Sequence, residues 1–145
     1  MPLFVKSVLL LCMLTTLVWA NHVNVDSLAN HVDMSITNNL EGNEDLTLHC
    51  KSSENDLREQ LLHINQTFKW GFGYNFFGGT KFICSFQWKN SPLLHFYAYN
   101  QNRDQGVCAD CHWFIHKDGP CRYEKQPIEK PGPDVLRICY NWIKE

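Results

Sequence analysis

Aromatic residues at alternate positions dominate the middle of the sequence. Two series, separated by Gly78-Gly79, consist of Phe68, Trp70, Phe72 and Tyr74, followed by Phe82, Cys84, Phe86 and Trp88. Side chains at every second residue lie on the same face of a β-strand, so each series predicts a half-buried strand. We expect the two strands to be neighbours, joined through the Gly-Gly turn.

Shorter apolar alternations predict further strands. They are Val32, Met34 and Ile36; Leu46, Leu48 and Cys50; Leu94, Phe96 and Ala98; Cys111, Trp113 and Ile115; and Ile138, Tyr140 and Trp142. The turn-rich segment 38–45 suits a hairpin between the first two, and Asp118-Gly119 suits another. Roughly seven or eight short strands with turns between them predict an all-β fold, a small disulfide-bonded antiparallel β-sandwich.

Two segments do not follow the strand pattern. Residues 55–64 place apolar side chains at near-helical spacing and predict a short helix of about two turns. Residues 127–133 contain three prolines and predict an extended surface loop or an edge.

The first twenty residues have the features of a secretory signal peptide. Lys6 supplies a positive charge, residues 8–18 form an apolar stretch, and Val18-Trp19-Ala20 offers a cleavage site. The apolar stretch is too short for a membrane anchor, so we expect a secreted, extracellular protein with no membrane insertion after cleavage. Residues 21–145 then form a single domain, of which 21–30 is a flexible arm.

The cysteine count agrees with export. Cys12 leaves with the signal peptide, so six of the seven cysteines remain: Cys50, Cys84, Cys108, Cys111, Cys121 and Cys139. An even number of cysteines in an oxidising compartment predicts disulfides. The segment 108–112 also matches a c-type haem attachment pattern, and together with His116 and Cys121 it offers zinc ligands. Disulfide formation would consume these thiolates, so we expect no metal and no cofactor.

Charge and catalytic motifs exclude several functions. Without Lys6 the chain carries 12 basic and 15 acidic residues, which argues against a nucleic-acid partner. His112 and His116 could form an acid–base pair. Their positions alternate with Trp113 and Ile115, so they should instead face away from the core. The sequence has no complete catalytic motif, and we expect no enzyme and no catalytic residue.

One N-glycosylation sequon is present. Asn65 begins the sequon Asn65-Gln66-Thr67, whereas Asn90-Ser91-Pro92 is excluded by its proline. Glycosylation of Asn65 is therefore expected in a secreted chain.

Several segments together resemble the plant self-incompatibility S-protein family. They are Leu48-His49-Cys50-Lys51-Ser52, Asp56-Leu57, Phe68-Lys69-Trp70-Gly71-Phe72, Gly79-Thr80-Lys81-Phe82-Ile83-Cys84, Trp88, and finally Cys108, Cys111, Trp113 and Asp118-Gly119. The match covers nearly all of the chain after residue 20. It departs from the family pattern at Arg58, where a glycine is usual, and at Gln66 and Thr67.

The resemblance implies disulfide pairings. The four cysteines usual in the family correspond to Cys50, Cys84, Cys108 and Cys111, which leaves Cys121 and Cys139 to pair with each other. Cys108 and Cys111 are three residues apart on an inferred strand, where their side chains would point to opposite faces. We therefore expect them to pair with Cys50 and Cys84, in either combination, and not with each other.

The resemblance also implies a function. Members of the family are small secreted β-sandwiches that act as extracellular signals, one of them as a stigma determinant recognised by a pollen receptor. We expect a recognition ligand that binds a cell-surface membrane receptor protein. A secreted hydrolase or defence protein, and a carbohydrate or lipid binder, are the alternatives.

Two polar segments, 52–58 and 100–106, are the predicted partner-binding loops. Their charged residues are Glu54, Asp56, Arg58, Arg103 and Asp104. Recognition residues are often carried on loops held by a rigid scaffold, and arginine is enriched among residues that dominate binding energy. Recognition should therefore depend on these loops, Arg58 and Arg103 first, and not on the histidine pair.

Overall fold

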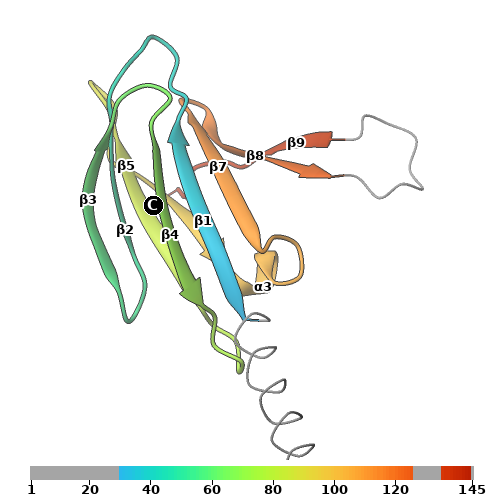
Figure 1. Cartoon of the computed structure of the whole chain (residues 1–145). Helices are drawn as coiled ribbons and strands as arrows, with labels where there is room; N and C mark the ends of the chain where they lie inside the picture. Colours follow the sequence, from blue (N-terminus) through green and yellow to red (C-terminus); the bar gives the residue numbers. More distant parts are fainter. Residues whose placement is uncertain (1–29, 126–134, 145) are drawn as a thin grey trace, which may run out of the picture. The chain divides into compact units, whose positions relative to one another are not determined.

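A computed structural model describes residues 30–125 and 135–144 of the chain (Figure 1). Its elements are β1 (His31–Asn38), β2 (Leu46–Lys51), β3 (Asp56–Leu62), β4 (Thr67–Gly73), β5 (Lys81–Gln87), β6 (Leu94–Asn100), α3 (Gln101–Asp104), β7 (Asp110–His116), β8 (Gly119–Lys125) and β9 (Val135–Cys139). The predicted signal peptide, the arm at 21–29 and the proline-rich segment 127–133 lie outside the described residues. Within the described residues, no helix is long and apolar enough to cross a membrane.

The described strands form two sheets. One sheet has five strands in the order β4-β1-β7-β8-β9, and the other has four in the order β3-β2-β5-β6. The predicted all-β sandwich is confirmed, with one departure from antiparallel pairing. β1 runs parallel to β7, with Ile36 opposite Trp113. The hairpin predicted at Asp118-Gly119 is present, since β7 pairs antiparallel with β8 and His116 lies opposite Gly119.

Two predicted strand pairings are wrong. β1 and β2 do not form a hairpin, and β4 and β5 are not neighbours, because in each case the two strands belong to different sheets. The aromatic series therefore meet face to face across the core instead of side by side. The ring centroid of Phe82 on β5 lies 4.6 Å from Phe72 and 5.7 Å from Trp70, both on β4. Burying both aromatic faces against each other removes more apolar surface from water than placing them side by side in one sheet.

The predicted helix over 55–64 is also wrong. Residues 56–62 of this segment form β3, which pairs antiparallel with β2 and places Leu62 opposite Leu46. Leu62 and Leu46 are both buried, whereas Leu61 stays exposed. Pairing with the edge of β2 satisfies the backbone groups of both strands, and this tertiary gain overrides a short helical pattern.

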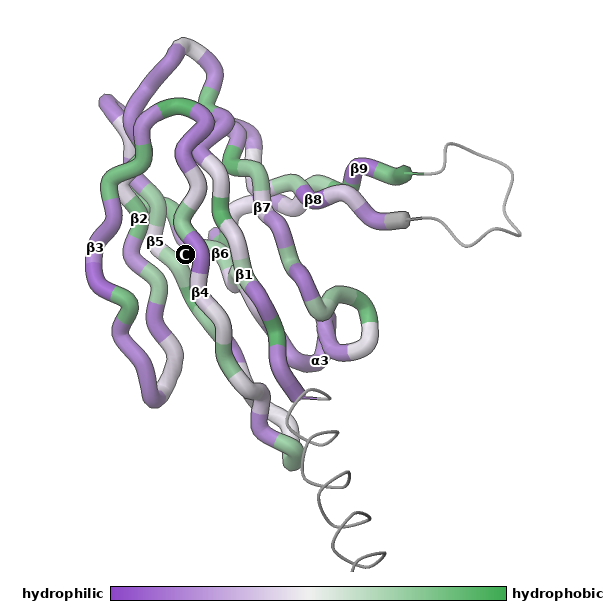
Figure 2. The backbone as a smooth tube through the Cα atoms, viewed as in Figure 1, coloured by the Kyte–Doolittle hydropathy of each residue, from purple (hydrophilic) through white to green (hydrophobic). Residues whose placement is uncertain are grey.

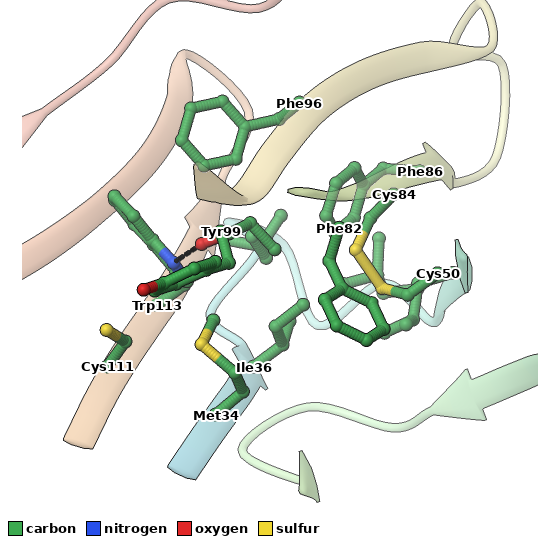
Figure 3. Close-up of a cluster of buried hydrophobic side chains, with 14 of the residues drawn as sticks. Met34, Ile36, Cys50, Phe82, Cys84, Phe86, Phe96, Tyr99, Cys111 and Trp113 are labelled. Carbon is green, nitrogen blue, oxygen red and sulfur yellow. Dashed lines mark hydrogen bonds between the residues drawn. A yellow bond between two sulfur atoms is a disulfide. The ribbon is translucent and has the colours of Figure 1, made fainter. Parts of the chain in front are cut away.

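The core lies between the two sheets and is centred on large rings (Figure 3). Trp113, Tyr99 and Phe86 have no exposed surface. The indole Nε1 of Trp113 donates a hydrogen bond to the carbonyl oxygen of Ala98 at 2.7 Å. A buried indole needs such a partner, and this bond ties β7 in one sheet to β6 in the other.

The disulfides of the structure correct the predicted pairings. Cys50 bonds to Cys84, and Cys108 bonds to Cys111, so the expectation that Cys108 and Cys111 would reach Cys50 and Cys84 is wrong. The error comes from the strand boundary. β7 begins only at Asp110, so Cys108 precedes the strand and its chain turns back, leaving the two Cα atoms 5.3 Å apart. The pairing of Cys121 with Cys139 is as predicted.

Candidate functional site

Two loops meet at the end of the sandwich where β2 and β4 finish (Figure 1). One is the short connection 52–55 between β2 and β3. The other is the connection 74–80 between β4 and β5, called here the aromatic loop. Both line a single open groove of about 360 Å³.

The connection 52–55 is a turn closed by its own hydrogen bonds. The backbone N–H of Ser52 donates to the carbonyl of Asn55 at 2.8 Å, and the Oγ of Ser52 accepts from the N–H of Asn55 at 3.0 Å. Serine is favoured here because its hydroxyl satisfies a backbone donor of the turn. Glu54, at the centre of the turn, is exposed and lines the groove.

The base of the aromatic loop is held on both sides by polar contacts. The N–H of Asn75 donates to the Oγ1 of Thr80 at 2.8 Å. The side chain of Gln101, at the start of α3, accepts from the N–H of Thr80 at 3.0 Å and donates to the carbonyl of Asn75 at 2.9 Å. Gly78 and Gly79 have φ values of 88° and 93°, which glycine adopts without steric cost. The loop therefore has a fixed base, and two glycines connect its tip to β5.

The tip of the aromatic loop exposes two phenylalanines. Phe76 is 80 % exposed and Phe77 is 93 % exposed, and their rings meet edge to face with centroids 5.9 Å apart. Figure 2 shows this tip as a hydrophobic stretch at the end of the connection below β4. Exposed single apolar side chains are common on protein surfaces, whereas contiguous apolar patches mark interaction sites.

The groove lies beside this tip, between Asn75 and Gly78 of the same loop and the turn 52–55, and polar groups line much of it. Residues 52–55 contribute serine, glutamate and asparagine side chains, and the aromatic loop contributes Asn75 and Thr80. The rings of Phe72 and Phe82 also line the groove. Such an arrangement suits an apolar group of a partner, surrounded by hydrogen-bonding groups, better than it suits a reaction, which needs a positioned nucleophile or base.

The predicted residues Asp56 and Arg58 lie on β3, not in a free loop. Asp56 accepts from His49 at 2.6 Å between Oδ1 and Nε2, and from the N–H of Arg58 at 2.8 Å. The bond to His49 and then that to Arg58 lower the pKa of the Asp56 carboxyl. Arg58 is exposed and has a φ of 63°, which is the conformation that a glycine would favour at this position.

Asp104, predicted to lie in a partner-binding loop, is buried, and Arg103 beside it is half-buried. Asp104 has no exposed surface, and it accepts hydrogen bonds from Arg103 Nε at 2.6 Å, Arg122 Nη1 at 2.8 Å and the N–H of Asn100 at 2.8 Å. Burial opposes ionisation of the Asp104 carboxyl, but these hydrogen bonds outweigh it and hold its pKa below the usual value. Asp104 is therefore the buried centre of a charged cluster that includes the half-buried Arg103 and the buried Arg122.

The histidine pair lies on the outer face of the five-stranded sheet, as predicted. The Nε2 of His112 bonds to the Oγ1 of Thr37 at 2.7 Å, and burial lowers the pKa of its imidazole. His116 has different partners, since its Nδ1 lies 3.0 Å from the Oε1 of Glu41 and its Nε2 lies 3.1 Å from the Nδ2 of Asn39. The two imidazoles share no hydrogen-bond partner among these contacts.

The cysteines that could have bound haem or zinc are engaged in disulfides. Cys108 and Cys111 bond to each other, and Cys121 bonds to Cys139. Over residues 30–125 and 135–144, no group of three or more His, Cys, Asp or Glu side chains is placed to hold a metal ion.

Sequence reasoning missed Phe76 and Phe77. Both residues follow closely on the alternating series that ends at Tyr74, which predicts a strand and not an exposed tip. Adjacent residues on a strand point to opposite faces, so two neighbouring phenylalanines cannot both enter the core. Their position directly before Gly78-Gly79 is the signal that could have identified an exposed aromatic tip.

Comparison with known proteins identifies relatives over most of the described chain. The model of the family described as plant self-incompatibility protein S1 matches residues 33–142. S-protein homolog 5 of Arabidopsis thaliana is 44% identical over 88 residues, which are 61% of this chain and 68% of that protein. S-protein homolog 2 of the same plant is 34% identical over 116 residues, which are 77% of this chain and 68% of that protein.

A solved structure agrees with the fold. It belongs to SPH (self-incompatibility protein homologue) proteins, described as a widespread family of small, highly stable, secreted proteins from plants. It covers 79% of this chain and 96% of its own, with a TM-score of 0.50 and 19% identity. The extracellular location predicted from the first twenty residues agrees with this description. On the extent of these matches, the chain belongs to the plant self-incompatibility protein S1 family, among the S-protein homologues.

Proposed function

We propose that this protein is a secreted, non-catalytic recognition ligand that binds a receptor protein at the plant cell surface through the aromatic loop and its groove. The observation that carries the proposal is the pair Phe76 and Phe77, exposed by 80 % and 93 % at the tip of a loop whose base is fixed. Fixing the base reduces the conformational entropy lost on binding.

The composition of this end suits a protein interface. Phenylalanine is enriched at interfaces, and burying one such side chain contributes about 1.5–3 kcal/mol. Glu54 and the amides around the groove supply the polar rim that usually surrounds an apolar centre. The predicted site thus shifts from the charged residues Arg103 and Asp104 to an aromatic centre with polar neighbours.

The predicted glycan position is compatible with recognition at this end. Asn65 lies in the connection between β3 and β4, at the opposite end of the sandwich from the aromatic loop (Figure 1). Its side chain is exposed and its φ is 63°, a conformation that asparagine tolerates. A bulky glycan at Asn65 would leave the groove open.

The arrangement of the histidines supports a role without catalysis. An acid–base mechanism needs two groups that reach the same substrate, within hydrogen-bonding distance of the atoms they protonate. His112 and His116 instead bond to separate partners, Thr37 in one case and Asn39 and Glu41 in the other.

The test is a binding measurement on plant cells. The mature protein is labelled with a fluorophore, and its binding to protoplasts is measured with unlabelled protein as competitor. We expect saturable binding, which prior protease treatment of the cells abolishes. Replacing Phe76 and Phe77 together by serine should weaken competition by tenfold or more, since a truncated hot-spot residue costs about 2 kcal/mol or more.

Leu93→Ser is the matched control. Leu93 is 54 % exposed and precedes β6, at the other end of the sandwich. This variant should compete like the unaltered protein. Binding that survives protease treatment would favour a carbohydrate or lipid binder, and equal competition by both variants would reject the aromatic loop as the site.

A further inference from the structure

Cys108 and Cys111 are unequal partners in their disulfide. Cys108 is half-buried just before β7 and packs against the core, whereas Cys111 is 1 % exposed and belongs to the core. They are separated by only two residues, Ala109 and Asp110. A Cys-x-x-Cys pair whose first cysteine is partly exposed and whose second is buried is an arrangement in which thiols exchange readily with disulfides.

The surroundings of both sulfurs suit the reduced state. The Nη1 of Arg122 lies 3.8 Å from the Sγ of Cys108, so a guanidinium would contact a Cys108 thiolate. The Sγ of Cys111 lies 3.3 Å from the carbonyl oxygen of Cys108, which would accept a hydrogen bond from a Cys111 thiol. Asp104 and Glu124 offset part of the charge of Arg122, but the group in contact with the sulfur is the guanidinium.

We propose that Cys108–Cys111 is a reversible thiol–disulfide exchange site of the folded protein, acting on low-molecular-weight thiols. A thiolate of the small thiol attacks the Sγ of Cys108 and forms a mixed disulfide. The bond between the two cysteines breaks, and its electron pair goes to Cys111, which takes a proton from water. A second small thiolate then attacks the sulfur of the first, releasing an oxidised small disulfide and the Cys108 thiolate.

The atoms and electrons of this exchange balance without another reactant. Two small thiols lose two electrons and become one disulfide, and the protein disulfide gains two electrons and becomes two thiols. The reverse direction starts with the thiolate of Cys108, the less buried of the two cysteines, and ends when Cys111 resolves the mixed disulfide. Cys108 is the attacking sulfur and Cys111 the resolving one.

Several hydrogen bonds around the site remain in place when this disulfide opens. The N–H of Cys108 donates to the carbonyl of Asp104 at 3.1 Å, and the N–H of Asp33 donates to the carbonyl of Ala109 at 2.8 Å. The bond from Trp113 to Ala98 also holds β7 against β6. Opening a link between residues only three positions apart releases little chain entropy, so the reduced protein should stay folded.

The other two disulfides provide internal references. Cys50 and Cys84 have no exposed surface. Cys121–Cys139 is the stricter reference, because Cys139 is exposed and the Nη2 of Arg137 lies 3.4 Å from the Sγ of Cys121. This second pair joins directly opposed strand residues 18 positions apart, so it tests whether the Cys-x-x-Cys arrangement matters beyond exposure and an arginine contact.

The experiment equilibrates the folded protein in buffers of defined ratio of reduced to oxidised dithiothreitol. Free thiols are trapped by alkylation and located by peptide mass mapping, and circular dichroism is recorded on the same samples. We expect labelling of Cys108 and Cys111 at a ratio of reduced to oxidised dithiothreitol about tenfold lower than the ratio at which Cys121 and Cys139 are labelled. The circular dichroism spectrum should not change at that ratio. Reoxidation should restore the bond between Cys108 and Cys111. Labelling of Cys121 and Cys139 first, or of all six cysteines together with loss of the spectrum, would overturn the proposal.

A charge variant tests the thiolate directly. Asp110 is exposed and lies between the two cysteines in sequence, so its carboxylate opposes a negative charge on Cys108. Asp110→Asn should ease reduction of this disulfide about threefold. Asp118→Asn also removes one negative charge, but at the other end of β7. It should leave unchanged the dithiothreitol ratio at which Cys108–Cys111 is reduced. An identical response of both variants would contradict the assignment of the thiolate to Cys108.

Discussion

Arg122 donates from Nη1 to the Oδ1 of Asp104 across 2.8 Å, at a point where the carboxylate has no exposed surface. The bond joins β8 to α3. The guanidinium carbons of Arg103 and Arg122 lie 5.2 and 5.0 Å from the ring centroid of Trp113, so both cations also contact the aromatic core. One carboxylate therefore holds two arginines at the place where the chain passes from one sheet to the other.

Asp104→Asn removes the carboxylate that both guanidinium groups share, and in the part of the chain that the structure describes only Arg122 of the two keeps an ion pair, with Glu124. Breaking a buried ion pair on one side costs about 3–5 kcal/mol, because an uncompensated charge stays buried. We expect a loss of this size in the free energy of unfolding, measured by urea denaturation. Asp118→Asn changes an exposed carboxylate and should stay within about 0.5 kcal/mol of the unaltered protein. Similar midpoints for the two variants would show that the cluster contributes little.

The carboxylate of Asp104 should also make the free energy of unfolding depend on pH in the acid range. The pKa of Asp104 is lower in the folded protein than its usual value of 3.8, so the unfolded chain takes up the proton first as the pH falls. The contribution of Asp104 is therefore complete above about pH 4 and is lost as the pH falls further, through the folded-state pKa.

The measurement is a series of urea denaturations between pH 7 and pH 2. The decline in unfolding free energy below pH 4 should be shallower in Asp104→Asn than in the unaltered protein. The carboxyl ¹³C shift of Asp104 in the unaltered protein provides an independent check. A titration midpoint at or above 3.8 there would contradict the expected direction.

Local patterns in the sequence predicted most of the strands, though not β3, but did not predict which strands are neighbours. The alternation at Phe68 to Tyr74 and at Phe82 to Trp88 marks β4 and β5 correctly, since a period of two is a property of each strand alone. Sheet membership depends on contacts between distant segments. β1 pairs with β7, whose residues lie 77 positions later, and nothing in either strand specifies this partner.

The candidate site was harder to predict than the fold. Charge suggested that Arg103 and Asp104 face water, yet the two arginines around Asp104 allow it to be buried, because a buried charge is tolerated when it is paired and hydrogen-bonded. Hydrophobicity suggested that the phenylalanines belong to the core, yet Phe76 and Phe77 are exposed. In both cases the outcome depends on partners that only the folded chain brings together.

Gly119→Ala should destabilise the hairpin between β7 and β8. Gly119 has a φ of 152°, and a Cβ there would lie 2.0 Å from the carbonyl oxygen of Tyr140, so the backbone must shift. We expect a loss of about 1–3 kcal/mol in thermal or urea unfolding, as for overpacked positions. Gly78→Ala is the control, since it has a φ of 88° but no atom within 4 Å of the added Cβ. It should cost only the backbone penalty of about 1 kcal/mol, and an equal or larger loss for Gly78→Ala would contradict the clash at Tyr140.

Asn65→Asp tests the predicted glycan with a closely matched control. Asn65 and Asn90 have φ values of 63° and 62°, so aspartate should be tolerated similarly at both positions. Protein secreted from plant cells should lose the mass of one glycan in Asn65→Asp and keep it in Asn90→Asp, because Pro92 prevents modification of Asn90. An unmodified mass for the unaltered protein would reject glycosylation at Asn65.

The same variants test where the partner binds. Since Asn65 lies at the opposite end of the sandwich from the aromatic loop, loss of the glycan should leave binding to protoplasts unchanged. Weaker binding by Asn65→Asp, with unfolding like that of Asn90→Asp, would instead place the partner at the β3–β4 end.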